Sequence, residues 1–428
     1  MAVIYGGIPS SISIIMLSII IMLYGFDARN SLLLLPFLLY PFMFLIRIPD
    51  HQNTILAIIP DIAAMLAILG FFIRQGRRIR FNLMSMLLLV YAILNFINPA
   101  VHIFDAGALP YIFRQYVLPI IFTIVFLNAS QKDGSLPQRA LLLSIFSFSL
   151  VSVITLLNYL DIISIPPLFE EIYPYSSYIL DIETGITHGR SIVGSEIIPR
   201  INLFIGGALG SAAAILVSLA IISLFNFVSR IGRGLAIVCG VLLMTAAFLS
   251  LSYTILLPVI FSIAVFTYKR INIIYGLPIA FALTFYLINS IDLAGMSAYQ
   301  YLNEYIISSL YKLLTSNSIM AFLVGNGPKL TTSAYVYVTG SSAVDVGIFR
   351  ILFEQGIVNF TFFIAIIIIV LKQFFWAVNN GFLIDKFPFI LIFCTMLFSI
   401  HTNMTITPPF YPLFVLSMAG ILLKGKNA

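Results

Sequence analysis

The stretch Gly325–Gly356, GNGPKLTTSAYVYVTGSSAVDVGIFRILFEQG, is a polar interruption between long apolar segments. It opens with the turn Gly325-Asn326-Gly327, which has the composition of a phosphate-binding nest. It ends with Asp345, Arg350 and Glu354 at the head of an apolar helix. Ionisable groups at the edge of a membrane helix are costly, so they mark functional-site candidates. The stretch Gly325–Gly356 is therefore the first candidate for a functional site.

The composition places the chain in a membrane class. Of the 428 residues, 61% are hydrophobic and 9% are charged, with a mean hydropathy of +1.08. A soluble protein of this length needs more charge to cover its surface. Cys239 and Cys394 both lie within apolar runs, which excludes a disulfide framework and a Cys-rich metal site. The net charge of +6 fits loop arginines rather than nucleic-acid binding, because no basic run alternates with aromatic residues.

Apolar segments of spanning length recur along the whole chain. A helix needs roughly 20 apolar residues to cross a bilayer core, and about 13 segments approach that length. They are 8–25, 31–48, 54–73, 81–97, 110–128, 139–160, 201–227, 235–251, 253–268, 271–290, 346–371, 387–400 and 410–424. Pro36 and Pro41 predict a kinked or re-entrant second segment. Ile8–Tyr24 lacks a basic front and an Ala-x-Ala exit, so we expect a first span and no cleaved leader.

Basic residues in the short loops predict the orientation. The densest cluster, Arg74 to Arg80, marks a cytoplasmic loop. Counting spans alternately from it, the other basic pairs fall on the same side: Lys132/Arg139, Arg230/Arg233, Lys269/Arg270, Lys372/Lys386 and Lys424/Lys426. The C-terminus is then inside. The N-terminus is outside if all the segments span, and inside if one of the first three does not.

The same alternation places two long loops, 161–200 and 291–345, on the outer side. Long loops in a chain of short connections are more often functional than incidental. The second loop contains Met296–Thr315, where apolar residues recur at helical spacing, so we expect an interfacial helix there.

Four arginines remain on the outer side: Arg114, Arg190, Arg200 and Arg350. A guanidinium stays charged and binds phosphate bidentately, so their convergence on one face predicts an anion site. The alternative for each is snorkelling to lipid headgroups or pairing with a nearby carboxylate. For Arg350 that carboxylate would be Glu354, four residues further along the helix.

The sequence allows two roles for Asp345, a helix cap and a general base. It precedes a helix, so its carboxylate can cap the helix N-terminus. A carboxylate beside an arginine cluster at a membrane face also has the character of a general base for a sugar hydroxyl. Glu354 is the less favoured alternative for that role.

Three short motifs follow one another along the chain. They are Arg190–Gly194 (RSIVG) before Pro199, Phe248–Thr254 (FLSLSYT) between two short spans, and Gly325-x-Gly327 before Asp345-x-Gly347 and Glu354-x-Gly356. In this order they resemble the bacterial O-antigen polymerase and ligase superfamily. Ligases carry Ser-Arg where this chain has Ser252-Tyr253, and His-Asn where it has Asp345, so the likeness favours the polymerase branch.

The resemblance implies a fold and an activity. The fold would be all-α, a polytopic integral membrane protein of about 12–13 transmembrane helices with a GT-C-like character. The activity would be a metal-independent glycosyltransferase without cofactors, which moves a growing glycan from undecaprenyl diphosphate to a lipid-linked repeat unit. Arg114, Arg190, Arg200 and Arg350 would bind the diphosphate.

The partners would be the lipid-linked oligosaccharide, the bilayer, a chain-length regulator and a flippase. The expected location is the bacterial inner membrane, with the site facing the periplasm. The alternatives are an O-antigen ligase and a polysaccharide flippase or transporter.

Overall fold

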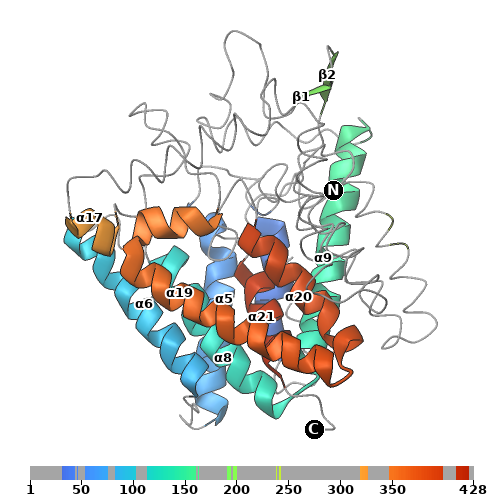
Figure 1. The fold of residues 1–428 in the computed structure, drawn as a ribbon. Helices are drawn as coiled ribbons and strands as arrows, with labels where there is room; N and C mark the ends of the chain where they lie inside the picture. The colour runs from blue at the N-terminus through green and yellow to red at the C-terminus, as the bar shows by residue number, and fades with distance from the viewer. Residues whose placement is uncertain are drawn as a thin grey trace.

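A bundle of apolar helices makes up most of the described part of the chain (Figure 1). The computed structural model describes residues 31–43, 46, 54–75, 82–102, 113–160, 162, 190–193, 196–199, 238, 241, 319–325, 347–398 and 411–423. Its α-helices are α3 (Ser31–Leu39), α5 (Thr54–Gln75), α6 (Leu83–His102), α8 (Leu118–Lys132), α9 (Leu136–Tyr159), α17 (Ile319–Val324), α19 (Gly347–Asn379), α20 (Leu383–Phe398) and α21 (Tyr411–Leu422). A 3₁₀ turn, η1 (Tyr40–Phe42), follows α3, and a π-helix, η3 (Phe113–Val117), precedes α8.

The described elements are helical apart from one short β-hairpin, which confirms the helical class; the number of membrane spans stays a prediction. Two helical stretches, Leu136–Ile154 and Ile351–Asn379, are long and apolar enough to cross a membrane. The other described helices carry shorter apolar windows. The predicted segments 8–25 and 201–290, and the interfacial helix at Met296–Thr315, lie outside the described residues or almost entirely so.

Proline decides the shape of the first described segment. Pro36 lies inside α3, and the helix changes to the 3₁₀ turn η1 where Pro41 follows Tyr40. Proline lacks a backbone N–H, so the α-helical hydrogen bond at that position cannot form. The predicted break in this segment is therefore confirmed at Pro41.

The core lies where α3, α8, α20 and α21 meet. Phe37 of α3 packs between Phe122 and Phe126 of α8, with ring centroids 5.9 and 5.0 Å apart. Gly420 of α21 lets the ring of Phe389 on α20 approach closely, because a Cβ there would lie 2.1 Å from the Phe389 ring. Around this centre, α3 packs on α5 and α9, while α19 packs on α6, α20 and α21.

Successive helices run antiparallel, which gives the bundle two distinct ends. The tight turns between α8 and α9 and between α19 and α20 lie together at the lower end in Figure 1. Lys386 lies at this end, and its Nζ donates to the carbonyl oxygens of Gly420 and Leu423 at the end of α21. We call this the turn end of the bundle.

A glycine divides α19 into two helices. Gly356 has φ 73° and ψ 175°, which interrupts the helical backbone. Gly325, just after α17, has φ 88° and lies against it. A Cβ on Gly356 would be 2.4 Å from Gly325 N, and one on Gly325 would be 2.3 Å from the carbonyl oxygen of Glu354. Gly325 and Gly356, the two ends of the polar stretch, thus form a close backbone crossing.

A short antiparallel hairpin lies in the first predicted long loop. Its strands are β1 (Arg190–Val193) and β2 (Glu196–Pro199), and Arg190 pairs with Pro199. The pairing runs from Arg190 opposite Pro199 to Val193 opposite Glu196.

Candidate functional site

The π-helix η3 positions the first group of polar side chains. Its five residues, Phe113–Val117, lead directly into Leu118-Pro119 at the start of α8. Pro119 cannot donate the backbone hydrogen bond that an α-helix would make to residue 115, so a wider turn precedes it. Such π-turns are frequent at functional sites. Here the turn carries both Arg114 and Tyr116.

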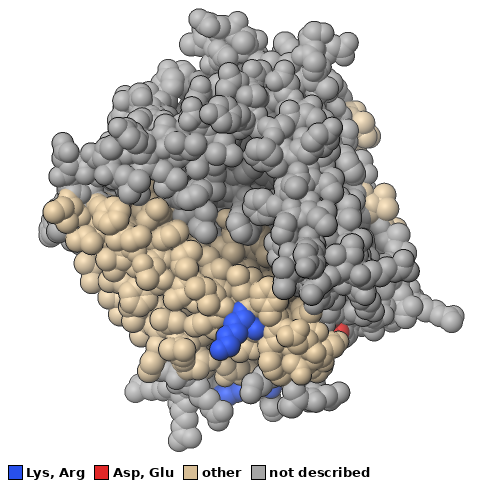
Figure 2. Space-filling view, viewed as in Figure 1, with Lys and Arg blue, Asp and Glu red and all other residues tan. Residues whose placement is uncertain are grey.

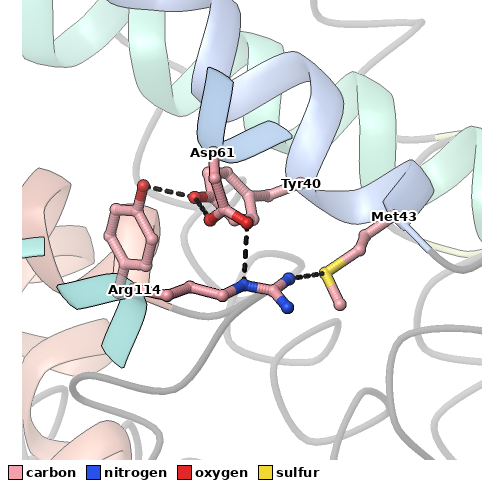
Figure 3. Close-up of polar contacts among 5 residues, drawn as sticks. Tyr40, Met43, Asp61 and Arg114 are labelled. Atoms are coloured by element: carbon pink, nitrogen blue, oxygen red, sulfur yellow. Dashed lines mark hydrogen bonds and ion pairs between the residues drawn. The ribbon is translucent and has the colours of Figure 1, made fainter. Parts of the chain in front are cut away.

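Arg114 forms an ion pair inside the bundle. Its Nε lies 2.7 Å from Oδ2 of Asp61 on α5. Tyr40 donates its hydroxyl proton to Oδ1 of the same carboxylate over 2.6 Å. Because that proton is used, Tyr411 at the start of α21 is the donor to the Tyr40 oxygen. We call Tyr40, Asp61, Arg114 and Tyr411 the Arg114 network (Figure 3).

The two charged members of the Arg114 network differ in exposure. The Asp61 side chain is 5% exposed and that of Arg114 is 26% exposed. Arg114 Nη2 also lies 3.5 Å from Sδ of Met43, a weak acceptor. Figure 3 shows one terminal nitrogen of the guanidinium directed at Met43 while Nε is directed at Asp61. The ion pair therefore orients Arg114 through Nε.

A second group surrounds Glu354. Tyr116 donates to Glu354 Oε2 over 2.8 Å, and Tyr91 of α6 donates to Gln355 Oε1 over 2.7 Å. Glu354 and Gln355 are 1% and 2% exposed. They directly precede Gly356, so the backbone crossing with Gly325 fixes where their chain lies. We call Tyr91, Tyr116, Glu354, Gln355 and nearby Asn359 the Glu354 network.

The two networks share one end of the bundle. Arg114 and Tyr116 lie two positions apart on η3, and Tyr116 reaches Glu354. The helix that follows η3, α8, ends at the α8–α9 turn, so η3 lies about 20 Å from the turn end. Tyr411 likewise begins α21, whose last turn binds Lys386. The polar networks and the turn end are therefore at opposite ends.

The predicted site residues meet different outcomes. Arg114 and Glu354 are brought together through Tyr116. Arg114 pairs with a carboxylate, which is one of its two expected roles, and that carboxylate is Asp61. Arg190 begins β1 and Arg350 lies in the first turn of α19, one turn before Glu354. Gly325 makes the backbone crossing.

The remaining predicted site residues, Arg200, Asn326, Gly327 and Asp345, lie outside the described residues. Their roles stay predictions. Among the residues that the structure does describe, no three His, Cys, Asp or Glu side chains gather as metal ligands.

Only Arg114 and Glu354 were predicted from the sequence; the other seven members of the networks were not: Tyr40, Asp61, Tyr91, Tyr116, Gln355, Asn359 and Tyr411. Asp61 carried a usable signal, since it is the one acidic residue in the apolar helix TILAIIPDIAAMLAILGFFIRQ. A lone carboxylate in such a helix needs a partner. The tyrosines carried none, because Tyr40 and Tyr411 meet across 371 positions of sequence.

Comparison with known proteins adds no relative. No family model matches the chain, and neither a curated protein nor a solved structure is similar to it. The fold and the site define a class: a protein whose described part is mainly helical, with two helices there long and apolar enough to cross a membrane and a buried polar site at one end of the bundle.

Proposed function

We propose that the chain is a multi-pass enzyme of the bacterial inner membrane that polymerises a surface polysaccharide of the O-antigen type. It would transfer a growing glycan from undecaprenyl diphosphate to a lipid-linked repeat unit at the periplasmic face. The order of the three sequence motifs supports this assignment. The observation that carries it furthest is Arg114, held by the buried Asp61 at the end of the bundle opposite the basic residues.

The membrane part of the proposal is supported by the bundle surface. One side of α6 is exposed and wholly apolar, formed by Leu83, Met86, Leu89, Val90, Ile93, Phe96 and Ile97. An exposed apolar stripe of this length is costly in water and favourable against lipid. Polar side chains within α8 and α9, such as Thr123, Ser144 and Ser147, donate to carbonyl oxygens four residues earlier in their own helices. They thus need no water as a partner.

The distribution of charge supports the proposed orientation. Lys132, Arg139 and Lys386 all lie at the turn end, at or beside the two tight turns. Figure 2 shows Lys and Arg in the lower part of the described surface and no charged atoms on the described surface above. Positive residues collect on the cytoplasmic side of membrane proteins. The Arg114 network would then face the periplasm, where the lipid-linked substrate is presented.

The chemistry assigned to the arginines is electrostatic. The acceptor hydroxyl oxygen attacks the anomeric carbon of the donor, and the bond from that carbon to the diphosphate oxygen breaks. The diphosphate leaves with the electron pair of that bond, and the hydroxyl proton passes to a base, for which Asp345 is our proposal. Arg114, with Arg190, Arg200 and Arg350, would stabilise the charge on the leaving diphosphate. Asp61 and Tyr40 keep Arg114 in place before the substrate binds.

A flippase or transporter is the rival from another class. Its arginines are expected along a path across the bilayer, some of them near the midplane. Arg114 itself instead lies on η3, which precedes α8, and Tyr411 begins α21, while their partner Asp61 lies inside α5. This placement favours chemistry at one face. An O-antigen ligase remains the alternative within the class, with a lipid A-core acceptor in place of the repeat unit.

The test is reconstitution. The purified protein in liposomes, supplied with undecaprenyl-diphosphate-linked repeat units from the source cell, should produce a ladder of glycan lengths on a gel. Liposomes that also contain lipid A-core would reveal a ligase, because a single glycan–lipid A-core band would replace the ladder. If folded and inserted protein consumes neither substrate, both the polymerase and the ligase assignments are wrong.

A further inference from the structure

Two buried amide side chains on α19 each leave one atom without a partner in the described part of the chain. They are Nε2 of Gln355 and Oδ1 of Asn359, on residues that are 2% and 3% exposed. An unpaired buried polar atom costs about 1–3 kcal/mol, so such atoms almost always have a partner. A group that the described residues do not supply is therefore expected beside α19, where α6 packs on it.

The contacts of Tyr91 locate this group. Tyr91 donates to Gln355 Oε1 over 2.7 Å, which fixes the amide orientation and turns Nε2 away from Tyr91. The Tyr91 ring lies 5.8 Å from the ring of Phe363. Asn359 is one turn before Phe363 on the regular part of α19, so it lies on the face of α19 that Tyr91 covers. Tyr91 thus bonds to Gln355 and lies beside Phe363, and Asn359 is on the α19 face that Tyr91 covers.

The two atoms together define the chemistry of the missing partner. Gln355 Nε2 donates a hydrogen bond, and Asn359 Oδ1 accepts one. An anion cannot donate to Asn359, and an ammonium group cannot accept from Gln355. A hydroxyl group does both. The place therefore suits a neutral hydroxyl, and this separates it from Arg114, whose guanidinium favours an anion.

We propose that Gln355 and Asn359 bind a hydroxyl group of a neutral sugar. This deepens the proposed function, on which it rests, by assigning a place to the non-reducing sugar of the acceptor repeat unit. Amide side chains beside aromatic rings are typical of sites that orient a ligand through few polar groups. The place also adjoins Glu354, and Tyr116 links Glu354 to the turn that carries Arg114. Donor diphosphate and acceptor sugar would then lie on either side of η3.

The experiment measures sugar binding without turnover. Purified full-length protein in nanodiscs is mixed with a panel of methyl pyranosides (glucoside, galactoside, mannoside), and saturation-transfer NMR follows the sugar ring protons. Wild type should transfer saturation to at least one glycoside. Asn359→Leu removes the unpaired oxygen and should weaken binding about tenfold, the worth of one well-made hydrogen bond to a buried partner.

The matched control is Asn380→Leu just beyond the same helix, at the opposite end of the bundle, where the Asn side chain donates to Trp376 O. This variant should bind as wild type does. If Asn359→Leu fails to fold, the double variant Gln355→Met/Tyr91→Phe replaces it, because it removes the hydrogen-bonded pair together and leaves neither of those two side chains with an unpaired atom.

Two outcomes would overturn the sugar site. One is that wild type transfers saturation to none of the glycosides; the other is that Asn359→Leu binds them as wild type does. Either result would leave water as the hydroxyl that the amides hold. Because no diphosphate is present, this result is separate from the reconstitution test. Polymer formed without glycoside binding would reject the sugar site alone, and glycoside binding without polymer would reject the polymerase alone.

Discussion

Asp61 is the residue on which the Arg114 network depends. Its Oδ2 forms an ion pair with Arg114 and its Oδ1 accepts a hydrogen bond from Tyr40, so both carboxylate oxygens are engaged although the side chain is almost fully buried. Burying one charge without its partner costs far more than burying the pair. The arrangement therefore stabilises Arg114 in a low-dielectric place before any anion arrives, and an anion at the outer edge of the guanidinium adds to that stabilisation.

Replacement of Asp61 by Asn separates the structural role of the carboxylate from the anion site. In Asp61→Asn the amide keeps an acceptor for Arg114 but leaves the guanidinium uncompensated. The free energy of unfolding should fall, by less than the about 3–5 kcal/mol of a fully buried pair because Arg114 is 26% exposed. Pyrophosphate can replace the lost charge, so it should raise the melting temperature of Asp61→Asn more than that of wild type.

Thermal unfolding of the purified proteins, with and without pyrophosphate, measures this difference. Sodium sulfate at equal ionic strength is the control for salt effects. An equal response to pyrophosphate in wild type and variant would show that no anion reaches Arg114, and the proposed diphosphate role would fall.

The shape of the Arg114 side chain gives a second prediction. Arg114→Lys keeps the charge but loses the fork that binds two phosphate oxygens at once. A charge-assisted hydrogen bond is worth roughly 1.5–3 kcal/mol, so polymerisation should slow by about 10–150-fold if that bond is made in the transition state. The rate of ladder formation at matched protein level measures it. Arg139→Lys at the turn end, 4.0 Å from Asp133, is the control and should polymerise normally. Wild-type rates in Arg114→Lys would contradict the role.

The sequence predicted these residues unevenly, for a physical reason. Arg114 and Glu354 stand out because charge is rare in apolar helices. Their actual partners, Asp61 and Tyr116, depend on which helices pack together. Helical spacing predicts only neighbours within one helix, so it indicated Arg350 beside Glu354 and could not indicate Tyr116, which donates to Glu354 from another element.

At the scale of elements, the crossing of α17 and α19 is the tightest feature near the site. Gly325 and Gly356 both have positive φ, and neither has room for a Cβ. The crossing holds Glu354 and Gln355 against Tyr116 and Tyr91. The sequence pointed to this stretch through its composition. It could not show that its two ends touch, because that contact joins distant positions, Gly325 and Gly356, through backbone atoms.

Gly356→Ala should disrupt this crossing. The new Cβ would meet Gly325 N and Leu323 O at 2.4 Å, contacts that only a backbone shift can relieve. Gly381→Ala is the matched control, because Gly381 also has positive φ (82°) but no atom within 4 Å of a new Cβ. Both variants carry the strain of positive φ, and Gly356 adds to it because its ψ of 175° belongs to a region used almost only by Gly, at a cost of about 1–3 kcal/mol. Only Gly356→Ala should lose several-fold more protein or activity, as seen by immunoblot and by glycan ladder. Equal behaviour of the two variants would show that the crossing is not rigid.

The helices themselves were predicted well, since their signal is local. The segments 54–73, 139–160 and 410–424 correspond to α5 at Thr54–Gln75, α9 at Leu136–Tyr159 and α21 at Tyr411–Leu422. Apolar length decides these elements. The hairpin β1–β2 and the π-helix η3 were not predicted, because both are short, and η3 depends on the single residue Pro119 rather than on a long pattern.

At the scale of the whole molecule, the two ends of the bundle carry different residues, and this difference predicts which end faces which compartment. The turn end holds Lys132, Arg139 and Lys386, and the other end holds the Arg114 and Glu354 networks. If the bundle crosses a membrane, the ends must face different compartments. The basic residues predict that the turn end is cytoplasmic.

Cysteine labelling tests this arrangement directly. In a background in which Cys239 and Cys394 are replaced by Ala, the single substitutions are Gly134→Cys and Asn380→Cys, in the two tight turns, and Ile162→Cys, just beyond α9. All three positions are exposed; Ile162 is 63% exposed. A maleimide that does not cross membranes, added to spheroplasts, should label the Ile162→Cys variant alone. Permeabilised spheroplasts are the control and should be labelled at every position.

Labelling at positions 134 and 380 but not at 162 would invert the orientation and place Arg114 in the cytoplasm, where a periplasmic polymerase could not use it. Labelling of all three variants in intact spheroplasts would show that α9 does not cross the membrane, because the helix of Leu136–Tyr159 separates Gly134 from Ile162.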